Sequence, residues 1–60
     1  MMELNTTYII RVLINDKLLT YTGTIISIDD FFIEFKDKYG KIVSVNKKQV
    51  QSFEEVSNGY

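Results

Sequence analysis

The sequence predicts a small all-β domain: a five-stranded, strongly bent antiparallel sheet or open barrel with little or no helix. Apolar residues alternate at a period of two in the first β segment, so Tyr8, Ile10, Val12 and Ile14 share one face of a strand. Further short β-rich segments follow, separated by turn-forming residues. No long stretch has the apolar spacing of a helix, so we expect a single domain over residues 1–60.

The first two strands are expected to form a hairpin over residues 7–14 and 18–28. The Asn15-Asp16 pair between them suits a tight turn. Gly23 lies in the middle of the second strand. An interior glycine usually marks a bulge or a sharp bend, which allows a small sheet to curl.

The other strands are expected at residues 31–37, 42–46 and 50–54, with one 3₁₀ turn over 47–49. In the third strand Ile33 and Phe35 face the same way, and Gly40 supplies the turn that follows. We expect residues 1–6 to be loose or to form a short helix, and residues 56–60 to be a flexible tail.

The composition argues against catalysis and against a metal or cofactor. The chain has no His and no Cys, so it lacks the usual nucleophiles, the best general base and thiolate ligands. Asp29 and Asp30 are a conceivable pair for acid–base chemistry or for a hard cation. Adjacent strand residues point apart, so a turn in which Asp side chains cap backbone N–H groups is favoured instead. We therefore expect a binding protein with no catalytic residue, metal or cofactor.

Charge and hydropathy favour a cytoplasmic protein. The net charge is −1, which is unlike a general nucleic-acid binder, but five of the seven basic residues lie within residues 36–48. The apolar runs are too short to span a bilayer, and no signal-peptide pattern is visible. The bias toward Ile, Lys and Asn indicates an AT-rich genome or a phage.

Self-association is expected because a chain this short buries a marginal core and has no disulfide. The fourth and fifth strands contain no proline, and such unprotected edges invite pairing with another chain. The candidate interface consists of apolar residues on these strands: Ile42, Val43, Val45, Val50 and Phe53. The competing interpretation is that both edges are buried within the monomer's own barrel.

Three features are candidates for nucleic-acid contacts, and each has a simpler explanation. Phe31, at a turn edge, is suited either to stacking on a base or to packing in the core. Lys47 and Lys48 suit either phosphate contacts or a solvated loop. Tyr39 suits either a stacking role or an ordinary exposed position in a turn.

Residues 10–53 resemble the Sm-like family, and in particular its Hfq branch, as a divergent member. The first segment that carries the resemblance is Gly23-Thr24-Ile25-Ile26-Ser27-Ile28-Asp29-Asp30-Phe31. The second is Ile42-Val43-Ser44-Val45-Asn46-Lys47-Lys48-Gln49-Val50-Gln51-Ser52-Phe53. The chain departs from the family in its short N-terminal segment and in having Asn46-Lys47 where the second motif has its signature pair.

The resemblance implies a homo-oligomeric ring, from pentamer to heptamer, in which the fourth strand of one subunit pairs with the fifth strand of the next. It also implies a site for single-stranded RNA. In that site Phe31 stacks on uracil, Asp30 flanks the same pocket, and Asn46 and Lys47 contact base and phosphate. The alternative is a small β-barrel module for protein interaction or structural oligomerisation, without nucleic-acid binding.

Overall fold

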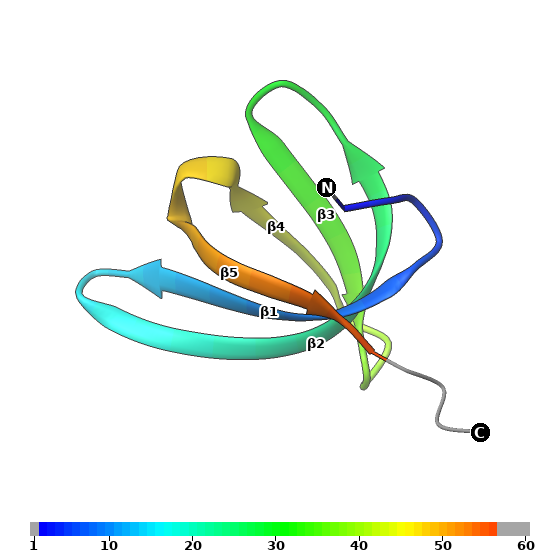
Figure 1. The fold of residues 1–60 in the computed structure, drawn as a ribbon, viewed down its shortest axis with the longest axis horizontal. Coiled ribbons are helices and arrows are strands. Elements are labelled where there is room, and N and C mark those ends of the chain that lie inside the picture. Colours follow the sequence, from blue (N-terminus) through cyan, green and yellow to red (C-terminus); the bar gives the residue numbers. More distant parts are fainter. Residues whose placement is uncertain (1, 57–60) are drawn as a thin grey trace.

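The computed structural model describes residues 2–56 and shows five strands and one short 3₁₀ helix (Figure 1). The elements are β1 (Thr7–Ile14), β2 (Lys17–Ile28), β3 (Phe32–Asp37), β4 (Ile42–Asn46), η1 (Lys47–Gln49) and β5 (Val50–Glu55). They form a single antiparallel sheet of five strands in the order β4-β3-β2-β1-β5. The predicted all-β class is confirmed.

The turn between β1 and β2 explains why these two strands form a regular hairpin. Asn15 and Asp16 have positive φ angles of 51° and 64°, in the left-handed region that these residue types tolerate. A two-residue turn of this kind matches the right-handed twist of its flanking strands. The hairpin register is therefore set at its tip, where Ile14 pairs with Lys17.

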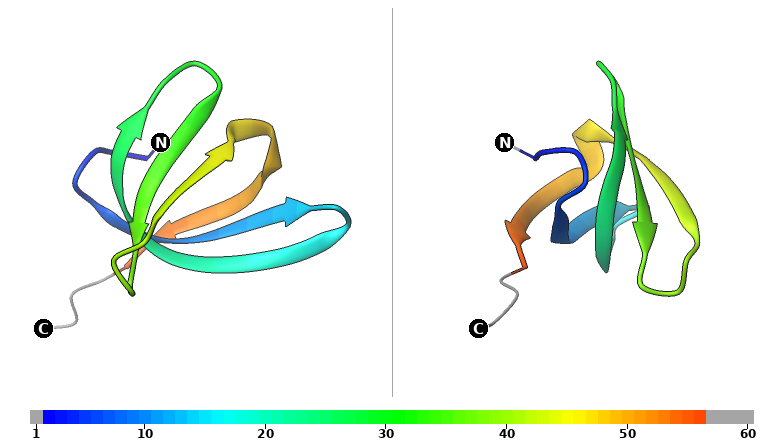
Figure 2. Two further views of the ribbon diagram at one scale, coloured as in Figure 1. Left: turned by 180° about the vertical axis from the view of Figure 1, so that it is seen from behind. Right: turned by 90° about the vertical axis from the view of Figure 1, so that its right-hand side faces the viewer.

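The sheet is strongly bent, and β2 is the strand that carries the bend (Figures 1 and 2). β2 pairs with β1 along its whole length, but with β3 only from Gly23 onward. The register with β3 shifts between Ile25 and Ser27, so the bulge lies three residues beyond Gly23. Gly23 itself keeps regular pairing on both sides, and the bulge predicted at this glycine is displaced along the strand.

Gly23 is instead required by close packing of the Phe35 ring. A Cβ atom at residue 23 would lie 2.9 Å from Phe35 Cγ and nearer still to Cδ1. Phe35 is completely buried, so its ring has no room to move away. Glycine at this position thus allows the largest fully buried side chain to lie directly against the backbone of β2.

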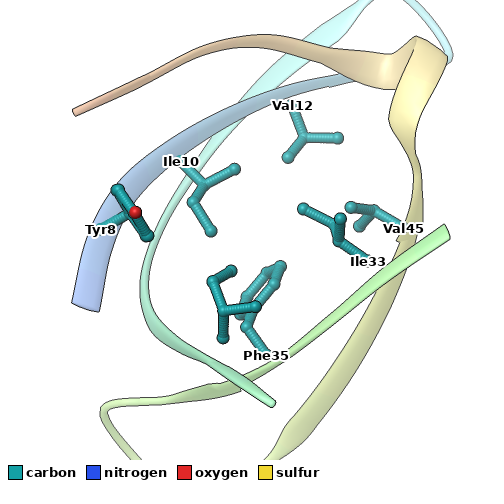
Figure 3. Packing of buried hydrophobic residues seen from close by; sticks show 7 residues of the cluster. Tyr8, Ile10, Val12, Ile33, Phe35 and Val45 are labelled. Atoms are coloured by element: carbon teal, nitrogen blue, oxygen red, sulfur yellow. The ribbon is translucent and has the colours of Figure 1, made fainter. Parts of the chain in front are cut away.

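The core occupies the concave face of the bent sheet (Figure 3). Its buried side chains are Tyr8, Ile10, Val12, Ile25, Ile33, Phe35 and Val45. The period-two face predicted for β1 is confirmed over its first three positions, whereas Ile14 near the hairpin tip is only half-buried. The Tyr8 hydroxyl accepts a hydrogen bond from the Glu3 backbone N–H at 2.8 Å, so its polar end is satisfied.

The N-terminal segment is not helical within residues 2–6. It turns at Asn5, whose φ is 62°, and the Asn5 N–H donates to the Ile25 carbonyl at 2.7 Å. The Ile25 N–H donates in return to the Thr6 carbonyl at 3.0 Å. These bonds fix the segment beside the bulged part of β2.

Three strand ends also differ by one residue from the prediction. β2 begins at Lys17 rather than at residue 18, β3 begins at Phe32 rather than at residue 31, and β5 extends to Glu55. Of the predicted flexible tail, Val56 is hydrogen-bonded through its N–H to the Thr7 carbonyl at 3.0 Å. The rest of that tail, residues 57–60, lies outside the described residues.

Replacing Gly23 with alanine should lower the free energy of unfolding by about 1–3 kcal/mol, the usual cost of overpacking a filled core. Chemical denaturation measures this loss. The matched control places the same change in a Phe35→Leu background, where the ring that meets the new methyl group is absent. The loss caused by Gly23→Ala should then shrink, and an equal loss in both backgrounds would contradict the contact.

Candidate functional site

The loop between β2 and β3 is built around the carboxylate of Asp29. Asp29 Oδ1 accepts hydrogen bonds from the backbone N–H of Phe31 at 2.8 Å and of Phe32 at 2.7 Å. The Asp29 N–H in turn donates to the Phe32 carbonyl at 2.9 Å. Asp29 is thus a turn cap, as favoured from the sequence. Because of this cap, β3 begins at Phe32, one residue later than predicted. Phe31 therefore lies outside the strand, and it is 67% exposed.

The pKa of Asp29 is lowered from its ordinary value, first by the N–H groups of Phe32 and Phe31. Partial desolvation opposes this shift, and the positive charge of Lys47 adds to it. The direction means that the two N–H groups favour the ionised form of the carboxylate. It also shows that Lys47 is close enough to act on this loop electrostatically.

The same loop is bonded to the end of β4. The Lys47 N–H donates to the Phe31 carbonyl at 2.8 Å, and Asn46 pairs with Phe32 across β3 and β4. The structure therefore brings Phe31, Asn46 and Lys47 together. Asp30 lies in the same loop and is exposed, so it adds a negative charge beside them.

Asn46 has a structural role that the sequence analysis missed. Its side-chain oxygen accepts from the Lys48 N–H at 2.9 Å, and Gln49 Oε1 accepts from the Asn46 N–H at 3.3 Å. This is a capping box at the start of η1. The Asn-x-x-Gln spacing was the available signal. Because the cap uses the side-chain oxygen, a base contact by Asn46 would come from its NH₂ group.

An apolar cleft of about 300 Å³ lies beside this loop. Its lining is made of Met2, Ile28, Ile33, Lys47, Val50 and Phe53. Val50 and Phe53 belong to the predicted interface, and Lys47 belongs to the predicted RNA site. The cleft therefore connects the two sets of candidate residues, while Met2 and Ile28 were not anticipated.

The five predicted interface residues do not all present side chains to a partner. Val45 is only 4% exposed and belongs to the monomer's core. Val43 and Val50 are half-buried and pack against that core. Ile42 and Phe53 are exposed, and the Phe53 ring meets Tyr8 edge-on with centroids 5.6 Å apart.

β4 and β5 are the two ends of the sheet order and are not paired with each other within residues 2–56. In the β3–β4 hairpin the Asp37 N–H donates to the Lys41 carbonyl, so these two residues form a hydrogen-bonded pair. Hydrogen-bonded and non-hydrogen-bonded pairs alternate along antiparallel strands, so the backbone N–H and C=O groups of Ile42 and Ser44 point away from β3. On the other side, the Val56 N–H donates to Thr7. By the same alternation, Phe53 and Glu55 turn their backbone groups away from β1.

The described residues contain no cluster of three or more acidic, His or Cys side chains placed to hold a metal ion. They also include no helix with the length and apolar character needed to cross a membrane.

The fold defines the class: a small all-β protein with one bent sheet, a core on its concave face and two edge strands that do not pair with each other within residues 2–56. Comparisons with protein-family models, with curated proteins and with solved structures find no match to this chain.

The Asp29 cap predicts a pH dependence of the loop. A depressed pKa means that this carboxylate contributes stability above its unfolded pKa of about 3.9 and that the contribution is lost as pH falls through the lower folded pKa. The protection of the Phe31 and Phe32 amides, measured relative to the intrinsic exchange rate at each pH, should therefore fall in acid, and carboxyl NMR should place the Asp29 midpoint below about 3.9.

Asp29→Ala should accelerate the same exchange at neutral pH. Asp30→Ala is the matched control, because it removes a carboxylate from the same loop but no backbone hydrogen bond seen among residues 2–56. Equal exchange in the wild type and in Asp29→Ala would show that the cap does not order the loop.

Proposed function

We propose that the chain assembles into an Sm-like homo-oligomeric ring that binds single-stranded RNA. The observation that carries this proposal is the hydrogen bond from the Lys47 N–H to the Phe31 carbonyl. It holds an exposed aromatic ring and a lysine at one end of the sheet, beside the start of β5 and the apolar cleft.

The assembly step follows from the two edge strands. β4 and β5 each present backbone groups outward, and unpaired edges of this kind pair readily with another strand. Pairing β4 of one subunit with β5 of the next uses both edges of every subunit. Such a head-to-tail contact closes into a ring when its rotation permits. The exposed side chains of Ile42 and Phe53 add apolar area to this contact.

The binding step follows from the chemistry of the loop. An exposed aromatic ring stacks on any base at about 1–3 kcal/mol, and a lysine contributes a phosphate contact without sequence preference. A ring repeats Phe31 and Lys47 once in each subunit, so weak sites add through multivalency. The net charge of −1 is compatible with this arrangement because the Asp29 carboxylate is already engaged by backbone N–H groups.

A second candidate is a structural or protein-binding oligomer without a role in RNA binding. The position of Asp30 favours it, because an exposed carboxylate beside Phe31 repels phosphate. This candidate shares the assembly step and differs only in the ligand of the loop.

Ser44→Pro should dissociate the assembly. The Ser44 N–H points away from β3, so proline there removes an outward donor while the β3–β4 pairing is retained. Light scattering should show the mass falling from that of an oligomer to that of the 7.0 kDa chain. Ser44→Ala keeps the N–H and should keep the wild-type mass. A monomeric wild type, or an oligomeric Ser44→Pro variant with intact β structure, would contradict edge pairing.

Phe31→Ala should lower the affinity for oligo-uridine roughly five- to 150-fold, the range that corresponds to one lost base stack. Lys47→Ala should weaken binding and flatten its salt dependence, because fewer counterions are released. Fluorescence anisotropy of labelled oligo-uridine and oligo-adenine at low salt measures both effects.

Tyr39→Ala is the matched control, because it removes an exposed aromatic ring from a different turn and should leave RNA affinity unchanged. If the assembled wild type binds neither oligonucleotide at high micromolar protein, the RNA-binding proposal is wrong and the second candidate, an oligomer without RNA binding, replaces it.

A further inference from the structure

β2 has an open edge that neither the core nor the β4–β5 contact uses. Its first half, residues 17–22, pairs with β1 on one side, and β3 begins to pair with β2 only at Gly23. Within residues 2–56 no other strand lies against this half of β2. In Figure 1 the tip of the β1–β2 hairpin lies at the left, away from the β3–β4 turn at the lower right.

The register identifies which backbone groups this edge presents. In a hairpin with a two-residue turn, the residues that flank the turn form a hydrogen-bonded pair, here Ile14 and Lys17. Alternation then points Leu18, Thr20 and Thr22 away from β1. Thr24, the next residue in this alternation, pairs with Lys36 of β3, which agrees with the assignment. Each outward residue offers one N–H donor and one C=O acceptor.

A groove of about 350 Å³ runs beside this edge. It is lined by Thr20, Tyr21, Thr22, Asp37, Lys38 and Tyr39. Its outer wall is the β3–β4 turn, where the Tyr39 ring is 82% exposed and lies 5.3 Å from Lys38 Nζ. At the other end of the edge Leu18 is 57% exposed and pairs with Leu13, which forms a small apolar patch.

The charge at the turn end of the groove is positive. Lys38 and Lys41 lie in this turn, Lys36 lies just before it in β3, and the single carboxylate within residues 36–41 belongs to Asp37. Asp37 Oδ1 accepts hydrogen bonds from the N–H groups of Tyr39 and Lys41, both at 2.9 Å. The one salt bridge in the described part of the chain joins Arg11 to Glu54, so none of the three lysines takes part in one.

We propose that an extended peptide segment with acidic residues at one end adds as a further strand to the 18–22 edge of β2. Its backbone would pair with Leu18, Thr20 and Thr22, as in other cases of strand addition. Its acidic end would lie toward Lys38, and its apolar end would lie beside Leu18. This site is separate from β4, β5 and the Phe31 loop, so it does not depend on the ring or on RNA binding.

The backbone chemistry of the edge favours a peptide over a nucleic acid. A strand edge alternates donors and acceptors, and a peptide backbone supplies the complementary alternation. Phosphate oxygens only accept hydrogen bonds, so an RNA backbone could donate to the outward carbonyl groups only through its 2′-hydroxyl groups and lacks the regular alternation of a strand. Tyr39 and the lysines alone would suit RNA, and this alternative is one outcome of the test.

The test uses two labelled hexapeptides, Glu-Glu-Thr-Val-Thr-Val and its reverse, which cover both strand directions. Each is titrated into the ¹⁵N-labelled protein. We expect one of them to shift the amide signals of Leu18, Thr20 and Thr22 with saturation at or below about 2 mM, the range of a weak single-strand contact. Two variants of that peptide carry N-methyl groups on its odd or on its even residues, and each variant lacks the N–H donors along one of its two edges. At least one of the two variants should not bind.

Lys38→Glu should weaken binding about two- to tenfold, as expected for an exposed charge contact, whereas Lys48→Glu, at the far loop, should not. The proposal is overturned if neither peptide shifts these three amides, if both N-methylated forms bind as well as the parent, or if Lys38→Glu has no effect. It is also overturned if oligo-uridine shifts the same amides and displaces the peptide, because the groove would then be a nucleic-acid site.

Discussion

The close approach of Phe35 to the bare backbone of Gly23 is the contact on which this small fold depends. A chain of this length has few side chains with which to fill a core, and Phe35 is the largest of those that are fully buried. Its ring lies against Gly23 and meets Tyr21 with centroids 5.3 Å apart. By filling the concave face from β3, it joins the β3–β4 half of the sheet to the β1–β2 half.

The bend that encloses this core also determines which edges stay open. β2 pairs with β3 only from Gly23 onward, so its first half stays open on that side. β4 and β5 lie at the two ends of the strand order and do not pair with each other within residues 2–56. Monomeric sheet proteins usually protect such edges with proline, charge or a covering segment. Here β4 carries exposed Ile42 and Ser44 and has no charged residue. The same packing that stabilises the monomer therefore leaves surfaces suited to another chain.

Most of the fold was predictable because its pattern is local. The bounds of β1, β4 and η1 agree with the alternation and turn residues of the sequence. The start of β3 was predicted one residue early because the Asp29 cap, rather than strand propensity, sets it. The ordered N-terminal turn was not predictable in this way. Its hydrogen bonds reach Ile25, some twenty residues away, at a bulge whose position depends on tertiary packing.

The candidate site was predictable to a similar extent. Phe31 and Lys47 occupy equivalent positions beyond the ends of β3 and β4, so a regular hairpin brings them together once its register is known. The burial of Val45 was missed because it depends on this register, which places Val45 opposite Ile33 with its side chain in the core. Sequence alone gives the edge strand but not which of its residues face a partner.

The placement of carboxylates explains how a chain with a net charge of −1 can present basic surfaces. Asp29 and Asp37 each accept two backbone N–H groups, whose dipoles offset part of the negative charge at the two loops. The lysines beside them, Lys47 and Lys38, are not in salt bridges within residues 2–56. Each loop therefore uses an aspartate to hold its turn while a neighbouring lysine and an exposed aromatic ring, Phe31 or Tyr39, face outward. The two loops have similar chemistry but different surroundings, since one lies at the apolar cleft beside β5 and the other lies at the open edge of β2. It is these surroundings, rather than the loops themselves, that separate the two proposals, a base at Phe31 and a peptide strand at Tyr39.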